Sequence, residues 1–281
     1  MSSQTDRIDA HVHVWTPDVD QYPLGEGYAP GDMKPASFTP EQLMEHAHPC
    51  GVERIVLIQM SFYGANDYML DVIESRPETF IGVAVIDDQA DRPQDEMREL
   101  QSRGVSGFRL VTPKRDVESW FASPGIQAMW KCGAEAGQSM CLLCAPGDLP
   151  AIERMCRQFP DTSVVIDHLA RIGRDGEVRN SEVDQLCRLG EQRQVHVKVS
   201  AFYTLGKKQP PYDDLAPMIR RLRDAYGAER LMWASDCPFQ VYPGHTYKDS
   251  VNLVAERLDF LSIEEKEWIL GKTAERVFFS I

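Results

Sequence analysis

The stretch Ile8-Asp9-Ala10-His11-Val12-His13-Val14 gives the first indication of the fold and of a functional site. Side chains alternate between the two faces of a strand, so this pattern places His11 and His13 on one face, with Asp9 beside them, and the apolar residues on the other. Histidine titrates near neutral pH and is a common metal ligand. The motif alone is equally compatible with an active or metal site and with two histidines held by local hydrogen bonds.

Similar apolar runs recur along the chain and alternate with helical patterns. Strands are expected at 7–14, 53–59, 80–86, 105–111, 139–145, 163–168, 195–200 and 230–235. Amphipathic helical segments follow near 40–50, 65–76, 92–103, 123–136, 148–158, 180–193, 213–226 and 247–259, with a further helical stretch at 263–279. Eight strand–helix units predict an α/β fold, a single (β/α)8 TIM barrel with a C-terminal helical extension. No linker divides the chain, so residues 1–281 are expected to form one domain.

The longest connections follow the predicted strands, at 15–39, 112–122, 169–179, 201–212 and 236–246. In a barrel of this class these loops rise from the C-terminal mouth, where active sites are built. The 15–39 segment is rich in proline and glycine, which predicts an irregular lid. Its aromatic residues leave a homodimer open as an alternative to a monomer.

Composition narrows the choice of partners. The 281 residues carry a formal charge of −13, from 30 basic and 43 acidic residues, which disfavours nucleic acid and anionic membranes as partners. A small-molecule substrate is compatible with this charge. The chain shows no membrane-length apolar run and no signal-peptide pattern, so a cytoplasmic protein is expected. The odd number of cysteines, mostly in apolar segments, predicts buried free thiols, and Cys141 and Cys144 should face opposite sides of their strand.

Polar residues near the ends of several strands share a parity that is expected to face the barrel interior. Asp167 shares a face with Val165, whereas His168 shares the other with Val164 and Ile166. Buried charge is costly unless it is paired or functional. We expect seven polar side chains to converge at one mouth: His11, His13, Arg109, His168, Lys198, Ser200 and Asp236.

Four strand ends carry motifs that resemble those of a known family. They read Ile8-Asp9-Ala10-His11-Val12-His13, Val165-Ile166-Asp167-His168, Val197-Lys198-Val199-Ser200 and Trp233-Ala234-Ser235-Asp236-Cys237-Pro238. In this order they are similar to successive motifs of the amidohydrolase superfamily. The nearest branch is the amidohydrolase-related lactonase group, which includes 2-pyrone-4,6-dicarboxylate hydrolase and sugar-acid lactonases.

The resemblance implies a hydrolase that opens the lactone ring of a small, anionic sugar-acid or pyrone-type substrate. Asp236 would be the general base toward water, and His11, His13 and His168 would polarise the carbonyl or hold a metal. The side chains expected to bind substrate are Arg109, Lys114, Arg115, Lys198, Ser200 and Tyr203.

The chain departs from the family pattern in places that bear on metal and substrate. Metal-dependent relatives usually have a histidine at the end of strand five, where this chain has Leu142-Leu143-Cys144-Ala145, and strand four ends Arg109-Leu110-Val111 without the bridging residue of binuclear relatives. We therefore expect no required cofactor, with a single Zn²⁺ or Mn²⁺ on His11, His13, His168 and Asp236 as the alternative. The loop at 201–208 lacks the arginine of the pyrone-dicarboxylate enzymes, so the substrate stays open.

Two other functions remain open. One is a metal-dependent decarboxylase of an aromatic or unsaturated acid on the same scaffold. The other is a catalytically silent binding barrel.

Overall fold

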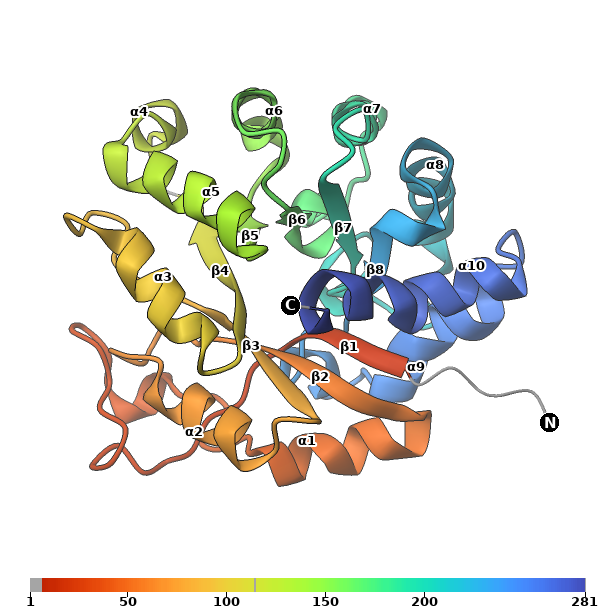
Figure 1. Ribbon diagram of the computed structural model, residues 1–281. Coiled ribbons are helices and arrows are strands. Elements are labelled where there is room, and N and C mark those ends of the chain that lie inside the picture. The colour runs from red at the N-terminus through yellow and green to blue at the C-terminus, as the bar shows by residue number, and fades with distance from the viewer. Residues whose placement is uncertain (1–6, 114, 281) are drawn as a thin grey trace.

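A ring of eight parallel strands forms the centre of the computed structural model, which describes residues 7–113 and 115–280 (Figure 1). The strands are β1 (Arg7–Val12), β2 (Val52–Ile58), β3 (Phe80–Ala84), β4 (Val105–Val111), β5 (Ser139–Leu143), β6 (Val164–Ile166), β7 (Val195–Val199) and β8 (Leu231–Trp233). Neighbours in the chain are neighbours in the sheet. All eight predicted strands, and the (β/α)8 barrel, are confirmed.

Helices surround the ring and follow the strands in turn (Figure 1). They are α1 (Pro40–Ala47), α2 (Asp67–Ser75), α3 (Pro93–Gln101), α4 (Val117–Phe121), α5 (Pro124–Ala136), α6 (Leu149–Gln158), α7 (Asn180–Leu189), α8 (Ala216–Tyr226), α9 (Tyr247–Asn252) and α10 (Ile263–Glu267). The short α4 lies in a connection predicted as a loop. The predicted C-terminal extension begins with α10 and continues in π-helical turns at Trp268–Lys272 and Glu275–Phe279.

Contacts between the first and last strands close the barrel. The Asp236 amide donates to the His11 carbonyl at 2.9 Å, and the His13 amide donates to the Cys237 carbonyl at 2.8 Å. Val12 and Cys237 form a parallel bridge. The closure therefore joins the backbone of the His11-Val12-His13 motif to the backbone of Asp236.

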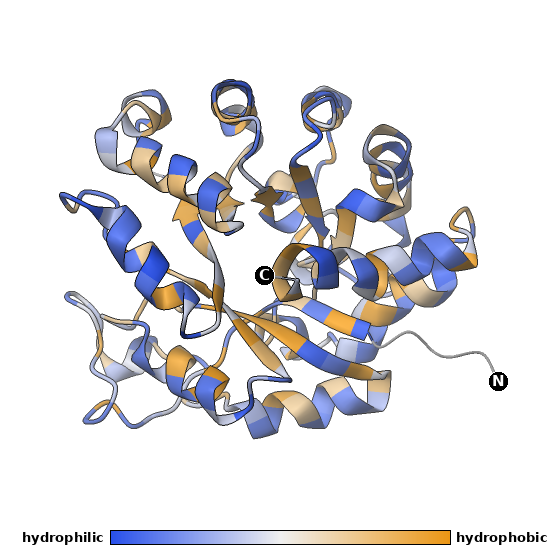
Figure 2. Ribbon diagram, viewed as in Figure 1, coloured by the Kyte–Doolittle hydropathy of each residue, from blue (hydrophilic) through white to orange (hydrophobic). Residues whose placement is uncertain are grey.

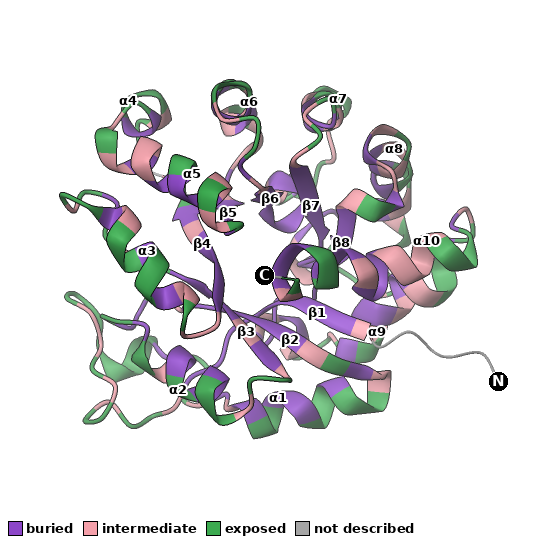
Figure 3. Ribbon diagram, in the orientation of Figure 1, coloured by how far each residue is buried: buried purple, intermediate pink, exposed green. Residues whose placement is uncertain are grey.

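Most strand residues are buried on both faces, as their apolar sequences require, whereas the helices expose their polar sides (Figures 2 and 3). One apolar cluster lies between strands and helices. A second, which we call the floor cluster, comprises Ile8, Ala10, Val56, Ile58, Val83, Cys141, Val165, Met232, Ala234, Ala274, Val277 and Phe278. Because its members come from six strands and the C-terminal segment, they meet inside the ring.

The C-terminal segment supplies the largest side chain of the floor cluster. Phe278 is fully buried, and its ring centroid lies 5.6 Å from the Lys198 Nζ. The last helical turns lie across one end of the strand ring (Figure 1). Phe278 thus separates that end from the polar residues further along the strands.

A β-bulge in β1 decides which of its residues face inward. Asp9 pairs with Ile55 and Val12 pairs with Leu57, so three steps along β1 match two along β2. The extra residue interrupts the alternation of side chains. As a result Ala10 lies in the floor cluster although the adjacent His11 also reaches the interior.

One prediction about β1 is therefore wrong. Ile8 and Ala10 do not lie on the face opposite the histidines, and Asp9 does not share the histidines' cavity. The Asp9 carboxylate accepts hydrogen bonds from the Ser235 amide at 2.9 Å and from the Tyr247 hydroxyl of α9 at 2.7 Å. Burial raises the Asp9 pKa to about 6, against the opposing effect of these bonds. Asp9 ties β1 to β8 and α9.

The cysteines behave as the sequence predicts. All seven are free thiols, and five of them are buried. Cys141 lies in the floor cluster and Cys144 in the outer apolar cluster, so the two sulfurs face opposite sides of the sheet. Within the part of the chain that the structure describes, no helix combines the length and apolar character needed to cross a membrane.

Candidate active site

The carboxyl ends of four strands bring a cluster of ionisable side chains into one place. His11 and His13 come from β1, Asp167 and His168 follow β6, Lys198 and Ser200 lie at the end of β7, and Asp236 follows β8. Each of them is buried. Six of the seven residues that the sequence predicted to converge are joined by the contacts described below.

Left-handed backbone turns aim two of these side chains. The φ angle is 53° at His168, and the next three residues are also positive; Asp236 has φ of 65°. Non-glycine residues rarely adopt this conformation, and it is found most often at functional sites. Because the chain turns at His168, both Asp167 and His168 point into the cavity, although strand parity would separate them.

Asp236 lies at the centre of the cluster. Its Oδ2 accepts a 2.6 Å hydrogen bond from the Tyr203 hydroxyl. Its Oδ1 is 3.5 Å from the His13 Nε2 and 3.6 Å from the His11 Nε2. Burial disfavours its charge, but the neighbouring histidines, His168 foremost, outweigh burial and lower the Asp236 pKa below its usual value. Asp236 is therefore a carboxylate at neutral pH.

Tyr203 stays protonated beside this carboxylate. Burial, followed by the charge of Asp236, raises the pKa of the phenol far above its ordinary value. The hydroxyl therefore remains a donor that holds Oδ2. Oδ1 is left facing the two histidines.

A buried ion pair supports His11 from the side of the floor cluster. The Lys198 Nζ lies 3.0 Å from the Asp167 Oδ1 and 3.1 Å from the His11 Nδ1. Burial opposes ionisation of Asp167, but Lys198 and then His11 lower its pKa well below the usual value. Lys198 and Asp167 are both fully buried, so each charge depends on the other.

The hydrogen bonds assign ring protons to His11 and His13. An ammonium can only donate, so the His11 Nδ1 accepts from Lys198 and the proton lies on its Nε2. The Ile58 carbonyl can only accept, so the His13 Nδ1 donates to it at 2.8 Å and the His13 Nε2 keeps a lone pair. The two Nε2 atoms are 3.2 Å apart, which completes a donor–acceptor pair.

His168 completes the cluster on the β6 side. Its Nδ1 lies 2.9 Å from the Ser200 Oγ, and its Nε2 lies 3.9 Å from the Asp236 Oδ2. Ser200 donates to the Lys198 carbonyl at 3.4 Å, so its oxygen accepts from His168. Burial lowers the pKa of both His168 and His11, so both imidazoles are neutral at neutral pH.

The cluster also meets the geometric requirements of a metal site. The His11 Nε2, His13 Nε2 and Asp236 Oδ1 form a triangle with sides of 3.2, 3.5 and 3.6 Å. Donors about 2.0–2.2 Å from a tetrahedral zinc ion are about 3.3 Å from one another. His11, Asp167 and His168 form a second group of possible ligands. These residues therefore fit one divalent ion.

The tautomer of His11 is the point on which metal binding depends. With its proton on Nε2, His11 offers no lone pair to an ion at that atom. If the proton moves to Nδ1, the Asp167 Oδ1, at 3.5 Å, is the available acceptor. Lys198 thus favours one tautomer and Asp167 the other.

The predicted cationic residues are not all in the same place. Arg109, on β4, is half-buried and affects the pKa of His168, and its Nε has no hydrogen-bond partner within residues 7–113 and 115–280. Arg115 is exposed, lies over the Trp120 ring and is 3.3 Å from Asp88. Lys114 lies outside the described residues. Arg109 is thus the predicted arginine that adjoins the cluster.

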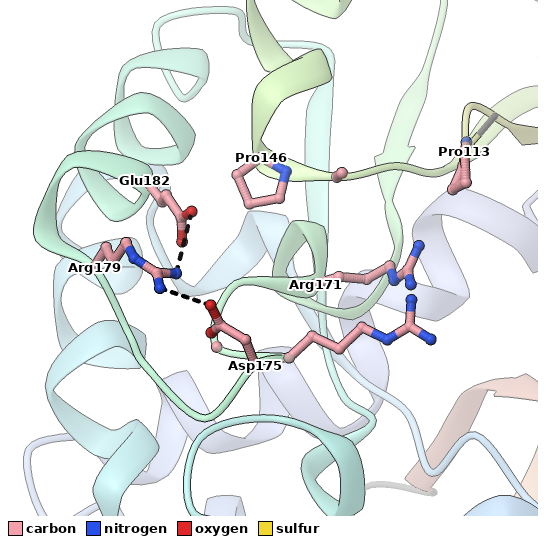
Figure 4. Close-up of a pocket in the computed structure, with 9 residues that line it drawn as sticks. Pro113, Pro146, Arg171, Asp175, Arg179 and Glu182 are labelled. Atoms are coloured by element: carbon pink, nitrogen blue, oxygen red, sulfur yellow. Dashed lines mark hydrogen bonds and ion pairs between the residues drawn. The ribbon is translucent and has the colours of Figure 1, made fainter. Parts of the chain in front are cut away.

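A pocket of about 570 Å³ opens among the loops that follow β4, β5 and β6 (Figure 4). Arg171, three residues after His168, extends along it toward the side of Pro113, whereas Arg179 turns to Asp175 and Glu182. Among the described residues, no carboxylate lies within ion-pair distance of Arg171 or Arg174. The pocket therefore carries uncompensated positive charge.

Two residues escaped the sequence reasoning. Strand parity placed Asp167 on the face opposite His168, so it was not included among the site residues, although a buried carboxylate is the partner that a buried ammonium such as Lys198 needs. Arg171 gave no local signal, because its position depends on the left-handed turns from His168 onward.

The family model described as Amidohydrolase matches residues 8–279. The chain belongs to this family. The match includes every residue of the polar cluster and, apart from Arg7, every strand residue. The superfamily predicted from the four strand-end motifs is thus confirmed, as is the prediction of an enzyme.

Two curated relatives are lactone hydrolases. The chain is 27% identical to the L-fucono-1,5-lactonase of Burkholderia ambifaria over 246 residues, which cover 86% of this chain and 83% of that protein. It is 25% identical to the 4-sulfomuconolactone hydrolase of Hydrogenophaga intermedia over 279 residues, covering 96% and 88%. These relatives connect the family assignment to ring-opening of lactones.

A solved structure has the same fold. A probable 2-pyrone-4,6-dicarboxylic acid hydrolase from Acinetobacter baumannii, crystallised with citric acid bound, superposes with a TM-score of 0.80. The match covers 98% of this chain and 99% of that one at 23% identity. This likeness supports the barrel architecture along the whole described chain.

Proposed function

We propose that this amidohydrolase hydrolyses a lactone of a small anionic acid, with Asp236 as the general base. The observation that carries the proposal is the arrangement of the Asp236 carboxylate, which is held by Tyr203 on one oxygen and faces the histidine pair with the other. The two curated relatives, both lactone hydrolases, point to the same reaction class.

Asp236 has the properties that proton abstraction requires. It is ionised at neutral pH, and the Tyr203 hydroxyl fixes its orientation. A water beside Oδ1 would transfer a proton to this oxygen as it attacks the lactone carbonyl. The bond between the carbonyl carbon and the ring oxygen then breaks, and the proton passes from Asp236 to the departing alkoxide.

Neutral imidazoles and an arginine face the charge that develops on the carbonyl oxygen. The His11 Nε2–H, which donates to the His13 Nε2 in the free site, would redirect this hydrogen bond to the carbonyl oxygen of a bound substrate, and Arg109 adds a positive charge near His168. Donors that are already oriented in a buried site stabilise an oxyanion without reorganising. A divalent ion bound at His11, His13 and Asp236 would add Lewis-acid polarisation and lower the pKa of water.

Lys198 has a positioning role in this scheme. It is fully buried and touches His11 and Asp167, so its part is to hold His11 as the Nε2–H tautomer. Ser200 orients His168 in the same way. The substrate-binding roles of Lys198 and Ser200 stay predictions. Arg109 and Arg171 are the cations that a substrate carboxylate or sulfonate could reach.

A lactone screen tests this function. Purified protein is assayed against sugar-acid, muconolactone-type and pyrone lactones with a pH indicator, before and after treatment with chelator, and with Asp236→Asn as the matched inactive variant. We expect acid release that depends on Asp236. Activity that disappears with chelator and returns with Zn²⁺ or Mn²⁺ would show that catalysis needs a divalent ion, for which His11, His13 and Asp236 are the proposed ligands.

The two alternatives give different results in the same screen. A decarboxylase would release CO2 from aromatic acids and leave lactones intact. A silent barrel would turn over neither class. Either result would overturn the proposal.

A further inference from the structure

The end of the barrel away from the active site contains a second cavity, of about 500 Å³. It is lined by Arg193 and His196 at the start of β7, by Glu229 and Arg230 just before β8, and by Arg276 in the C-terminal turns. His196 precedes Lys198 by two residues on the inner face of β7, which is about 7 Å along a strand. Phe278 and the rest of the floor cluster lie between this cavity and the active site.

The three arginines keep their positive charge without a carboxylate partner. Within the described residues, no ion pair joins Arg193, Arg230 or Arg276 to an acidic side chain. Arg230 instead donates to four backbone carbonyls, including those of Tyr226 at 2.7 Å and Gly190 at 2.9 Å. Neutral acceptors fix the guanidinium in place but leave its charge uncompensated.

The electrostatics of the neighbouring groups reflect this charge. Burial, followed by Arg276 and Arg230, lowers the His196 pKa to about 4. Burial also lowers the Arg230 pKa, and Arg193 and Arg276 add to that effect. The chain as a whole has a formal charge of −13, so a cavity with three guanidinium groups and one carboxylate has a charge opposite in sign to that of the whole chain.

His196 provides an independent sign of a ligand. Its side chain is only 9% exposed, and its Nδ1 has no hydrogen-bond partner among the described residues. Buried polar atoms nearly always have a partner, so an exception needs an explanation. A neutral imidazole can donate from Nδ1 to a bound anion once a rotation of the ring brings this atom to the cavity that His196 lines.

We propose that this cavity is a binding site for a small oxyanion, held by Arg193, Arg230, Arg276 and His196. Guanidinium groups form paired, charge-assisted hydrogen bonds with phosphate, sulfate and carboxylate oxygens. The site lies opposite the mouth and shares no residue with the catalytic cluster. A bound anion would fix Arg276, two residues before Phe278, and so stabilise the C-terminal segment.

Isothermal titration with inorganic phosphate, at constant ionic strength set with sodium chloride, tests the site. The test variant is Arg193→Gln/Arg276→Gln, in which both replaced side chains are exposed. The control is Arg92→Gln/Lys131→Gln, which removes the same charge from other exposed positions. We expect one phosphate per wild-type and control chain, and affinity at least about tenfold weaker in the test variant.

Two further measurements make the outcome decisive. Phosphate should shift the ¹⁵N resonances of the His196 ring, and lactonase activity should be equal in the test and control variants. A parallel titration with succinate shows whether the site prefers a carboxylate or a tetrahedral oxyanion. Binding of either anion that weakens when Arg193 and Arg276 are replaced supports the site. Absence of binding by both anions, or equal binding by test and control variants, would overturn the proposal.

Discussion

The mouth and the floor of this barrel are built on the same strands but contain opposite kinds of side chain. Met232 on β8 and Ala234 just after it lie in the floor cluster, and Asp236 enters the polar cluster two residues later. On β1 the change occurs between Ala10 and His11. Stability should therefore depend on the floor and chemistry on the mouth, and the two should be separable by mutation.

The largest effect is expected for Asp236→Asn, which removes the proposed base and keeps the shape of the side chain. We expect kcat/KM for the best lactone to fall by about 10³-fold or more, because an amide cannot accept the proton of water. The melting temperature should stay close to that of the wild type. The substitution weakens the interactions of residue 236 with Tyr203 and the histidines, but it also removes the free-energy cost of burying a charge. Steady-state assays with calorimetry measure both, and a fall in activity below tenfold would contradict the role of Asp236.

Phe278→Ala should have the opposite signature. Removal of a fully buried phenylalanine costs about 3–5 kcal/mol of unfolding free energy. Denaturant unfolding measures the loss, and Ile263→Ala, at an 81% exposed position on α10, is the control expected within about 0.5 kcal/mol of wild type. Equal effects of the two substitutions would show that the C-terminal segment does not close the barrel.

Lys198→Met tests the layer between floor and mouth. Loss of the donor to the His11 Nδ1 should lower kcat by about 10–100-fold, as for other residues that orient a catalytic histidine, with little change in KM. Zinc affinity should rise in the same variant, because the His11 proton can then move toward Asp167. Unfolding curves confirm that the variant is folded, and a change confined to KM would instead indicate contact with substrate.

Arg171→Gln should have the smallest effect, and it should depend on the substrate. We expect KM to rise about tenfold for an anionic lactone, because a charge-assisted hydrogen bond is lost, and to stay unchanged for a neutral one. Arg179→Gln is the control in the same pocket, because Arg179 is already paired with Asp175. Equal changes in the two variants would remove Arg171 from substrate recognition.

Much of the fold was predictable because apolar periodicity reports directly on burial. The strand count and order followed from the pattern, and His11, His13, Lys198 and Asp236 converge as the barrel requires. The orientation of Asp9 was not predictable, because a single extra residue in β1 reverses parity without leaving a clear sequence signal.

The local geometry of the site could not be predicted from the sequence either. The four consecutive residues from His168 to Arg171 have left-handed backbone conformations, and none of them is a glycine that would have predicted this turn. The Lys198–Asp167 pair depends on the register between β6 and β7, which a single sequence does not specify. These details place the His11 Nδ1 near both Lys198 and Asp167, the two groups that favour opposite tautomers of His11.

Ring-opening in H2¹⁸O tests most directly that the mouth directs water onto a lactone carbonyl. Mass spectrometry of the product after one turnover should show one ¹⁸O in the new carboxylate and none in the released hydroxyl, with the rate of incorporation abolished in Asp236→Asn. Label in the hydroxyl, or release of CO2 without lactone opening, would contradict the account.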